Sequence, residues 1–278
     1  MMAKPADFGK ALGTGVAWLL VACCCQARPL YHFKKASEPP LRTVVSGPFL
    51  FTTDLAEEEI SQLSLELLEL EKTISTELHL PRLAVPVRVY LFQGRSRYEQ
   101  FLQQTFPNLA GSAQRRRALF LLHDGAPYVV AYRTPELEKD LRHEFTHALL
   151  NTTLHDLPVW IDEGLAVFYE APGEPGGQPF YRALLRSQLS YGRVPRQEEL
   201  ESLTTDLQME GLDYAAAWSW MQFCLHGPLQ ARNALLDYLG DLQRTDPGER
   251  LPARLKAVIQ DPEAAWRVYL ERLLASNP

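Results

Sequence analysis

The stretch "TPELEKDLRHEFTHALLN", residues 134–151, is where the sequence changes from strand patterns to helix patterns. Thr134 is a residue type that favours helix N-caps, and Pro135 stands at the first helical position, where its fixed backbone angle suits a helix. Leu141 and Phe145 belong to an apolar stripe at helical spacing. We therefore expect one helix to run through this stretch.

Upstream of this helix the sequence alternates between strand and helix patterns. Apolar residues recur at helical spacing in residues 55–78, whereas residues 85–92 alternate between apolar and polar side chains as a half-buried strand does. Residues 118–134 form two β-rich runs around Asp124-Gly125, a sequence typical of a hairpin turn. Two further elements are expected, a strand at 49–54 and a helix at 96–106.

Downstream, strand patterns give way to helices. A second helix is expected at residues 159–170, directly after Pro158. Four more helical stretches follow, at 180–189, 214–226, 231–242 and 263–274. The order of elements predicts an α+β fold: a small mixed N-terminal sheet with helices and a hairpin, then the helix of residues 134–151 and a mainly helical C-terminal lobe. We place the two lobes at residues 48–170 and 171–278.

The first residues have the pattern of an export signal. Lys4 and Lys10 precede an uncharged apolar run, Ala11 to Ala22, that is shorter than the roughly 20 residues a membrane-spanning helix needs. The stretch "LVACCC", residues 20–25, resembles the lipobox of bacterial lipoproteins. We expect residues 1–22 to be a signal peptide and residues 23–47 a tether.

This resemblance implies an exported bacterial protein that is anchored to the membrane through a lipid on Cys23. The alternative is cleavage after Ala27, which would release a soluble protein. The remaining cysteine of the body, Cys224, stands alone, so no disulfide framework is expected.

The charge balance argues against nucleic acid as a partner. Residues with positive charge number 28 and those with negative charge 34, giving a formal net charge of -6. Such a chain has no excess of cations to neutralise a phosphate backbone, and its only tight basic run, residues 115–117, fits a solvated turn. The sequence carries no signal for an oligomeric state.

His143 and His147 lie four residues apart, with Glu144 directly after the first histidine. In a helix this spacing places the two imidazoles side by side, about 6 Å apart along the axis. Glu144 lies about 100° around the helix from His143, close enough to reach a water held by a metal there. The pattern predicts a metal site with its own general base.

The same spacing also fits an ordinary surface helix. Apolar residues form a single stripe, and the two histidines project nearly opposite to it, as a solvated face would. The stripe consists of Leu137, Leu141, Phe145, Ala148 and Leu149. Helical periodicity alone therefore leaves both interpretations open.

Glu163 favours the metal site. It stands sixteen residues after His147, on the helix expected at 159–170. Structural zinc sites are usually closed by four protein ligands, whereas catalytic sites use three and keep one position for water. Two histidines and one carboxylate meet the catalytic requirement.

With these residues the chain resembles the gluzincin branch of zinc metallopeptidases, in particular the bacterial peptidase MA-like group. The resemblance covers roughly residues 49–225 and depends on His143, Glu144, His147 and the stretch Glu163 to Ala166. It implies a zincin-like fold, Zn²⁺ as cofactor and a peptide or protein as substrate.

The resemblance also implies a role for each matching residue. His143, His147 and Glu163 would bind the metal, and Glu144 would take a proton from the metal-bound water. Tyr214, at the start of a predicted helix, resembles the tyrosine with which relatives stabilise the oxyanion. The alternative for Tyr214 is a tyrosine packed against the core.

One feature departs from the family. Relatives of thermolysin carry an acidic residue four positions after the third ligand, where it orients a histidine, but here Val167 stands at that position. Glu170 shares the helix face of Glu163 and is our candidate for this role.

Three functions follow from these observations. The first is an exported zinc metallopeptidase that hydrolyses peptide bonds. The second is a catalytically inactive lipoprotein that uses the zincin-like fold as a binding or assembly module, which the missing acidic residue favours. The third is a metal-dependent hydrolase that acts on another kind of bond.

Overall fold

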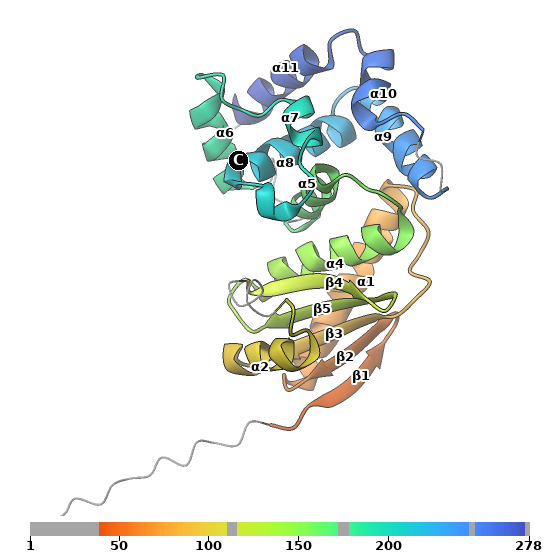
Figure 1. Cartoon of the computed structure of the whole chain (residues 1–278), viewed down its shortest axis with the longest axis vertical. Coiled ribbons are helices and arrows are strands. Elements are labelled where there is room, and N and C mark those ends of the chain that lie inside the picture. Colours follow the sequence, from red (N-terminus) through yellow and green to blue (C-terminus); the bar gives the residue numbers. More distant parts are fainter. Residues whose placement is uncertain (1–38, 110–115, 172–177, 245–247, 276–278) are drawn as a thin grey trace, which may run out of the picture. The chain divides into compact units, whose positions relative to one another are not determined.

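The computed structural model describes residues 39–109, 116–171, 178–244 and 248–275. The predicted signal peptide, Cys23 and most of the predicted tether lie outside these ranges. The described residues all belong to one compact unit, in which a five-stranded sheet is followed by helices (Figure 1). The predicted order, a small mixed sheet first and a helical region after it, is confirmed.

The sheet combines parallel and antiparallel pairs. Its strand order is β1-β2-β3-β5-β4, with β2, β3 and β5 parallel and the two edge strands antiparallel to their neighbours. The strands are β1 (Arg42–Ser46), β2 (Phe49–Thr53), β3 (Val87–Phe92), β4 (Ala118–His123) and β5 (Ala126–Tyr132). The predicted hairpin is confirmed as β4 and β5, and both turn residues, Asp124 and Gly125, have positive φ as a type I′ turn requires.

Strand β1 corrects the predicted tether. Residues 23–47 were expected to be a linker, but Arg42–Ser46 pairs along its whole length with β2. Thr43 and Val45 of this edge strand are exposed, so the strand lacks the apolar alternation by which buried strands are recognised. The prediction was wrong for these residues because β1 is held in the sheet by backbone hydrogen bonds to β2, which its side-chain pattern does not reveal.

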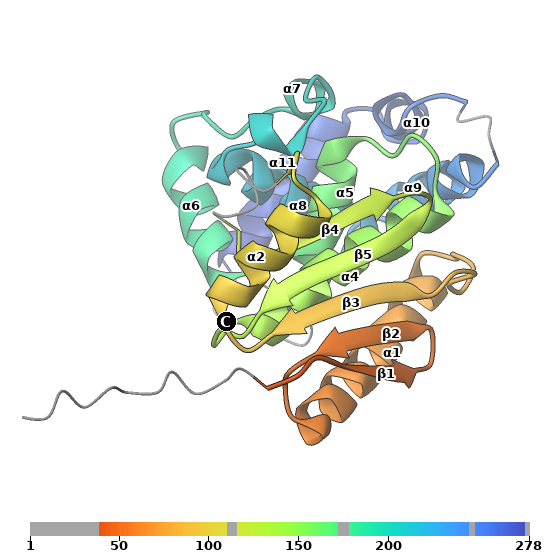
Figure 2. The same ribbon diagram turned by 60° about the horizontal axis from the view of Figure 1, so that its bottom comes forward.

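Helices cover both faces of the sheet. On one face lies α2 (Arg95–Thr105), and on the other lie α1 (Glu57–Glu77) and α4 (Leu137–Thr153), as Figure 2 shows. The apolar stripe predicted for the first helix, from Ile60 to Ile74, is buried in the core between α1 and the sheet. These contacts fix α4 against β4 and β5.

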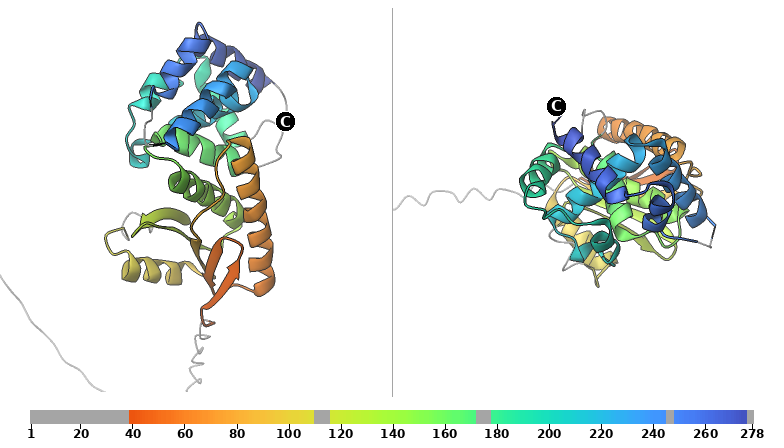
Figure 3. Two further views of the ribbon diagram at one scale, coloured as in Figure 1. Left: turned by 90° about the vertical axis from the view of Figure 1, so that its right-hand side faces the viewer. Right: turned by 90° about the horizontal axis from the view of Figure 1, so that it is seen from above.

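Beyond α4 the described residues form helices joined by loops, without a further strand. Helix α5 (Val159–Tyr169) packs on α4 and on α8 (Gly211–His226), so that α4 and α5 lie between the sheet and the C-terminal helices (Figure 3). The other helices are α6 (Pro179–Leu189), α7 (Gln197–Glu201), η1 (Asp206–Gln208), α9 (Leu229–Leu242), α10 (Leu251–Val258) and α11 (Pro262–Ala275). The short elements α7, η1 and α10 were not predicted.

Gly164 allows α5 and α8 to approach closely. A Cβ atom at this position would lie 2.8 Å from the carbonyl oxygen of Ala217 and 2.9 Å from the side chain of Met221, both on α8. Such distances are shorter than van der Waals contact, so any larger residue would push the helices apart. The glycine therefore sets the position of α5.

The start of α4 differs from the prediction by two residues. The helix begins at Leu137, with Glu136 at the N-cap position, rather than at Pro135. Thr134 is therefore not the N-cap, and its hydroxyl instead accepts the backbone N–H of Glu136 at 3.2 Å in a turn just before the helix. Among the described helices, none combines the length and the apolar character that crossing a membrane would require.

Candidate metal centre

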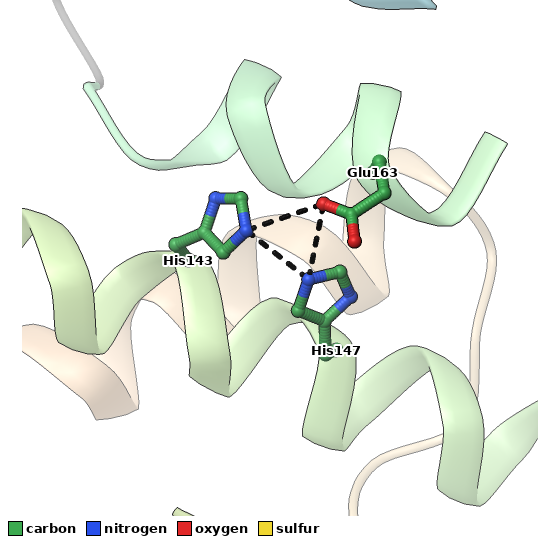
Figure 4. Close-up of side chains that lie close together, drawn as sticks. All are labelled: His143, His147 and Glu163. Carbon is green, nitrogen blue, oxygen red and sulfur yellow. Dashed lines mark hydrogen bonds and ion pairs between the residues drawn. The ribbon is translucent and has the colours of Figure 1, made fainter. Parts of the chain in front are cut away.

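Three side chains from α4 and α5 converge at the interface of these helices (Figure 4). The Nε2 atoms of His143 and His147 are 3.1 Å apart. The Oε2 atom of Glu163 lies 3.4 Å from the first of these nitrogens and 3.5 Å from the second. The predicted ligand set thus forms a nearly equilateral triangle of one oxygen and two nitrogens.

The size of this triangle suits a small tetrahedral cation. Ligands at about 2.0–2.1 Å from a tetrahedral zinc ion are separated from each other by about 3.3 Å. The three observed separations, 3.1, 3.4 and 3.5 Å, bracket this value. The residues therefore fit a metal ion without a change of backbone position.

Glu163 carries the clearest sign of a missing partner. Its Oε2 atom is buried, and among the described residues it has no hydrogen-bond partner. Burial has removed the hydration of this oxygen and no hydrogen bond replaces it, since its nearest neighbours are the two imidazole nitrogens at 3.4 and 3.5 Å. A cation bound at the triangle would satisfy it.

Each histidine is held by a carboxylate on its other ring nitrogen. The Nδ1 atom of His143 lies 2.9 Å from Glu170 Oε2, and that of His147 lies 2.8 Å from Asp162 Oδ1. In the neutral ring, a proton on Nδ1 donates to the carboxylate and leaves the Nε2 lone pair available. Both Nε2 atoms thus face Glu163 as potential metal ligands.

These carboxylates are held in turn by further groups. Lys139 Nζ lies 3.0 Å from Glu170 Oε1, and the amide of Asn151 donates to Asp162 Oδ2 at 2.9 Å. The predicted contact of Glu170 with a histidine is found in the structure. Asp162 was missed although it directly precedes Glu163 in the sequence, because the family pattern places the orienting acidic residue four positions after the third ligand, where Val167 stands.

The carboxylates around His143 and His147 favour positive charge at the candidate metal centre. Burial lowers the pKa of His143, but the neighbouring carboxylates of Glu163 and Glu170 outweigh burial and raise it to about 9. Burial likewise lowers the pKa of His147, yet the charges of Asp162 and Glu163 bring it well above its usual range. Burial would raise the pKa of Glu163, and the neighbouring histidines instead hold it well below its usual range. This field attracts a cation.

Glu144 lies beside the triangle and is not part of it. Its side chain is buried, and among the described residues no hydrogen bond or ion pair engages its carboxylate. Burial raises the pKa of this carboxyl, whereas the charges of His143 and His147 oppose the rise. A carboxylate with a raised pKa and no partner is suited to accept and return a proton.

The surface-helix interpretation of the motif is wrong. His147 is 7% exposed and Glu144 is 9% exposed, so neither belongs to a solvated face. Helix α5 covers this side of α4, and Phe120 on β4 stacks against His147 with ring centroids 6.3 Å apart. The apolar stripe opposite is buried as well, because α4 lies between the sheet and α5.

A recess of about 540 Å³ opens in front of His143 and Glu144. Tyr214 at the start of α8 lines it, as the prediction of an oxyanion-stabilising tyrosine requires. Tyr181 on α6 lines it too, and this residue was not predicted. The other lining residues are Arg116, Arg117, Ala118, Lys139, Asp140 and Glu170.

Comparison with known proteins adds no family to this picture. No family model matches the chain, and no curated protein is significantly similar to it. The described residues therefore establish a mixed α and β fold with a His143, His147 and Glu163 cluster that could hold a metal ion.

Proposed function

We propose that the chain is a zinc-dependent metallopeptidase of the gluzincin type, with a zincin-like fold. His143, His147 and Glu163 would hold the zinc ion, and Glu144 would act as general base. The observation that carries this proposal is the triangle of two imidazole nitrogens and one buried carboxylate oxygen that has no hydrogen bond, with separations of 3.1 to 3.5 Å. Three ligands leave a coordination position for water, as catalytic zinc sites do.

The ligand types favour zinc over the hard divalent cations. Calcium and magnesium bind mostly oxygen atoms, and they use six or more ligands. Two imidazoles and one carboxylate instead suit a borderline cation such as zinc. The separations within the triangle, 3.1 to 3.5 Å, also lie closer to tetrahedral geometry than to octahedral geometry, in which neighbouring ligands at the same bond length are only about 3.0 Å apart.

The chain's own residues would carry out the proton transfers. Bound zinc supplies Lewis acidity, which polarises a scissile carbonyl and makes water more acidic. Glu144 would accept a proton from the attacking water and deliver it to the leaving nitrogen. Tyr214, on the wall of the recess, would donate a hydrogen bond to the oxyanion.

The position of β4 supports a peptide as substrate. This strand is an edge of the sheet, paired on one side with β5, and the ring of Phe120 at its centre stacks on that of His147 with centroids 6.3 Å apart. The other edge of β4 can pair with an extended peptide through backbone hydrogen bonds, a common mode of peptide binding. A peptide bound there would pass directly by the metal triangle.

Metal analysis and peptide digestion test the proposal. The purified chain from Arg28 onward should contain about one zinc per molecule and should cleave members of a peptide library. Glu144→Gln should keep the zinc and lose hydrolysis, because the amide cannot accept the proton. Tyr214→Phe should lower kcat by about 100-fold or more if its hydroxyl binds the oxyanion, with Tyr181→Phe as the matched variant. A chain without stoichiometric zinc would overturn the proposal.

One of the two reasons for the alternative, a catalytically inactive binding module, no longer holds. That alternative rested on the absence of an acidic residue to orient a histidine and on the unknown substrate, and only the second reason stands. Asp162 and Glu170 perform this role for His147 and His143. Export and lipid attachment through Cys23 stay predictions from the sequence, and we propose them together with the peptidase activity.

A further inference from the structure

Arg116 lines the recess at the point where the chain enters β4. The same recess is lined by His143, Glu144 and Tyr214, which the proposed function places at the reacting bond. A substrate held at the metal triangle would therefore lie beside Arg116.

The other arginine and the lysine that line the recess are each paired within it. Arg117 binds Asp140 at 2.8 Å, and Lys139 binds Glu170 at 3.0 Å. In each of these pairs both partners line the recess. Their charges are therefore directed at each other rather than at an occupant of the recess.

Arg116 differs from these cations in the place of its partner. It pairs with Asp206 of η1, which does not line the recess. This pair uses one terminal nitrogen of the guanidinium, and 43% of the arginine side chain is exposed. A guanidinium has five N–H donors arranged as a planar fork, so donors are left for an anion inside the recess.

We propose that Arg116 binds a carboxylate of the substrate close to the scissile bond. The substrate class would then be peptides that carry an acidic side chain, or their own C-terminal carboxylate, next to the cleaved position. This inference rests on the proposed function, because the metal triangle places the bond to be cleaved. A fork of paired N–H donors matches the two oxygens of a carboxylate.

Binding of metal-anchored probes tests this inference without requiring turnover. Four hydroxamate-capped dipeptides would be titrated into the zinc-loaded full chain by calorimetry. They carry Glu or Gln next to the hydroxamate, and each has either a free carboxylate or an amide at its C-terminus. We expect at least one carboxylate to improve binding about tenfold over its amide counterpart.

Variants assign the preference to a residue. Arg116→Gln should abolish the preference for a carboxylate, and Arg116→Lys should keep part of it, because lysine has the charge but not the fork. Arg250→Gln is the matched control, since Arg250 makes a similar ion pair with Glu201 at 2.8 Å away from the recess. Raised salt should reduce the preference, because Arg116 is partly exposed.

The outcomes separate the two proposals. Preference for Glu over Gln would assign the carboxylate to a side chain, whereas preference for the free C-terminus would indicate release of C-terminal residues. Equal binding of all four probes, or a preference that survives Arg116→Gln, would overturn the role of Arg116 and leave the metal proposal standing. Failure of every probe to bind the zinc-loaded chain would overturn the proposed function and this inference with it.

Discussion

Helices α4 and α5 contribute to the same candidate metal centre, yet they are positioned by different parts of the chain. Helix α4 supplies His143 and His147, and its apolar stripe lies against the sheet. Helix α5 supplies Glu163 and is positioned by its contact with α8, which Gly164 permits. The two histidines are therefore fixed by one helix, while their distance to the carboxylate depends on the packing of two.

This difference indicates which substitutions should weaken the candidate metal centre. Within α4 the helix geometry itself keeps the two imidazoles side by side. The separations of 3.4 and 3.5 Å between the imidazoles and Glu163 instead depend on side-chain packing between α4, α5 and α8. Changes that act on α5 should therefore weaken the centre even when α4 is untouched.

Removal of the metal should have the largest effect on this pair of helices. A cation bound to both would connect them, and a ligand present at about 1,000 times its Kd stabilises the folded chain by about 4 kcal/mol. We expect a chelator to lower the unfolding temperature of the zinc-loaded chain. Scanning calorimetry with and without chelator measures the change.

The control for this measurement is Glu163→Ala, which removes the ligand on α5. Its unfolding temperature should hardly respond to the chelator, because the remaining histidines bind zinc weakly. An unchanged unfolding temperature for the unsubstituted chain on chelation would contradict the idea that a metal links α4 and α5.

The contrast between geometry within one helix and packing between helices also explains which features could be predicted from the sequence. The apolar stripe and the two histidines of α4 follow from local spacing, and so does the face shared by Glu163 and Glu170, seven residues apart on one helix. The hairpin was predicted from Asp124-Gly125, a turn whose backbone requirements are local. Local geometry was sufficient for all of these features.

Features that depend on contacts between distant segments were missed. Arg116 and Tyr181 are 65 residues apart in the sequence and line one recess. The burial of Glu144 and His147 depends on α5, so the pattern of α4 by itself suggested a solvated face. Strand β1 was missed because its pairing with β2, rather than its side chains, makes it a strand.

A substitution at Gly164 tests the packing of α5 directly. In Gly164→Ala the new Cβ would meet the backbone of Ala217 at 2.8 Å, and we expect a loss of about 1–3 kcal/mol in the free energy of unfolding. Zinc affinity should fall as well, because Glu163 moves with α5. Urea unfolding and zinc titration measure the two effects.

Gly240→Ala is the matched control. This glycine lies in α9, and no atom is within 4 Å of a Cβ placed there. Alanine favours the helix by about 0.5–1 kcal/mol over glycine, so this variant should be slightly more stable and bind zinc normally. If both variants behaved alike, close packing of α5 on α8 would not be what positions Glu163.

The carboxylates behind the histidines offer the finest test. Substitution of a carboxylate that orients a metal-binding histidine usually costs 10- to 100-fold in metal affinity. We expect Asp162→Asn and Glu170→Gln to weaken zinc binding within this range, as measured by competition with a chromogenic chelator. The exposed Glu138 on α4 provides a control, because Glu138→Gln leaves both histidine contacts in place.

The two variants should not be equal. Glu170 shares its charge with Lys139 at 3.0 Å, so less of it acts on His143. The second oxygen of Asp162 accepts a hydrogen bond from the amide of Asn151. Because this amide is neutral, the full charge of the Asp162 carboxylate acts on His147. Asp162→Asn should therefore be the more damaging change, and a larger loss in Glu170→Gln would show that Lys139 does not weaken the hold of Glu170 on its histidine.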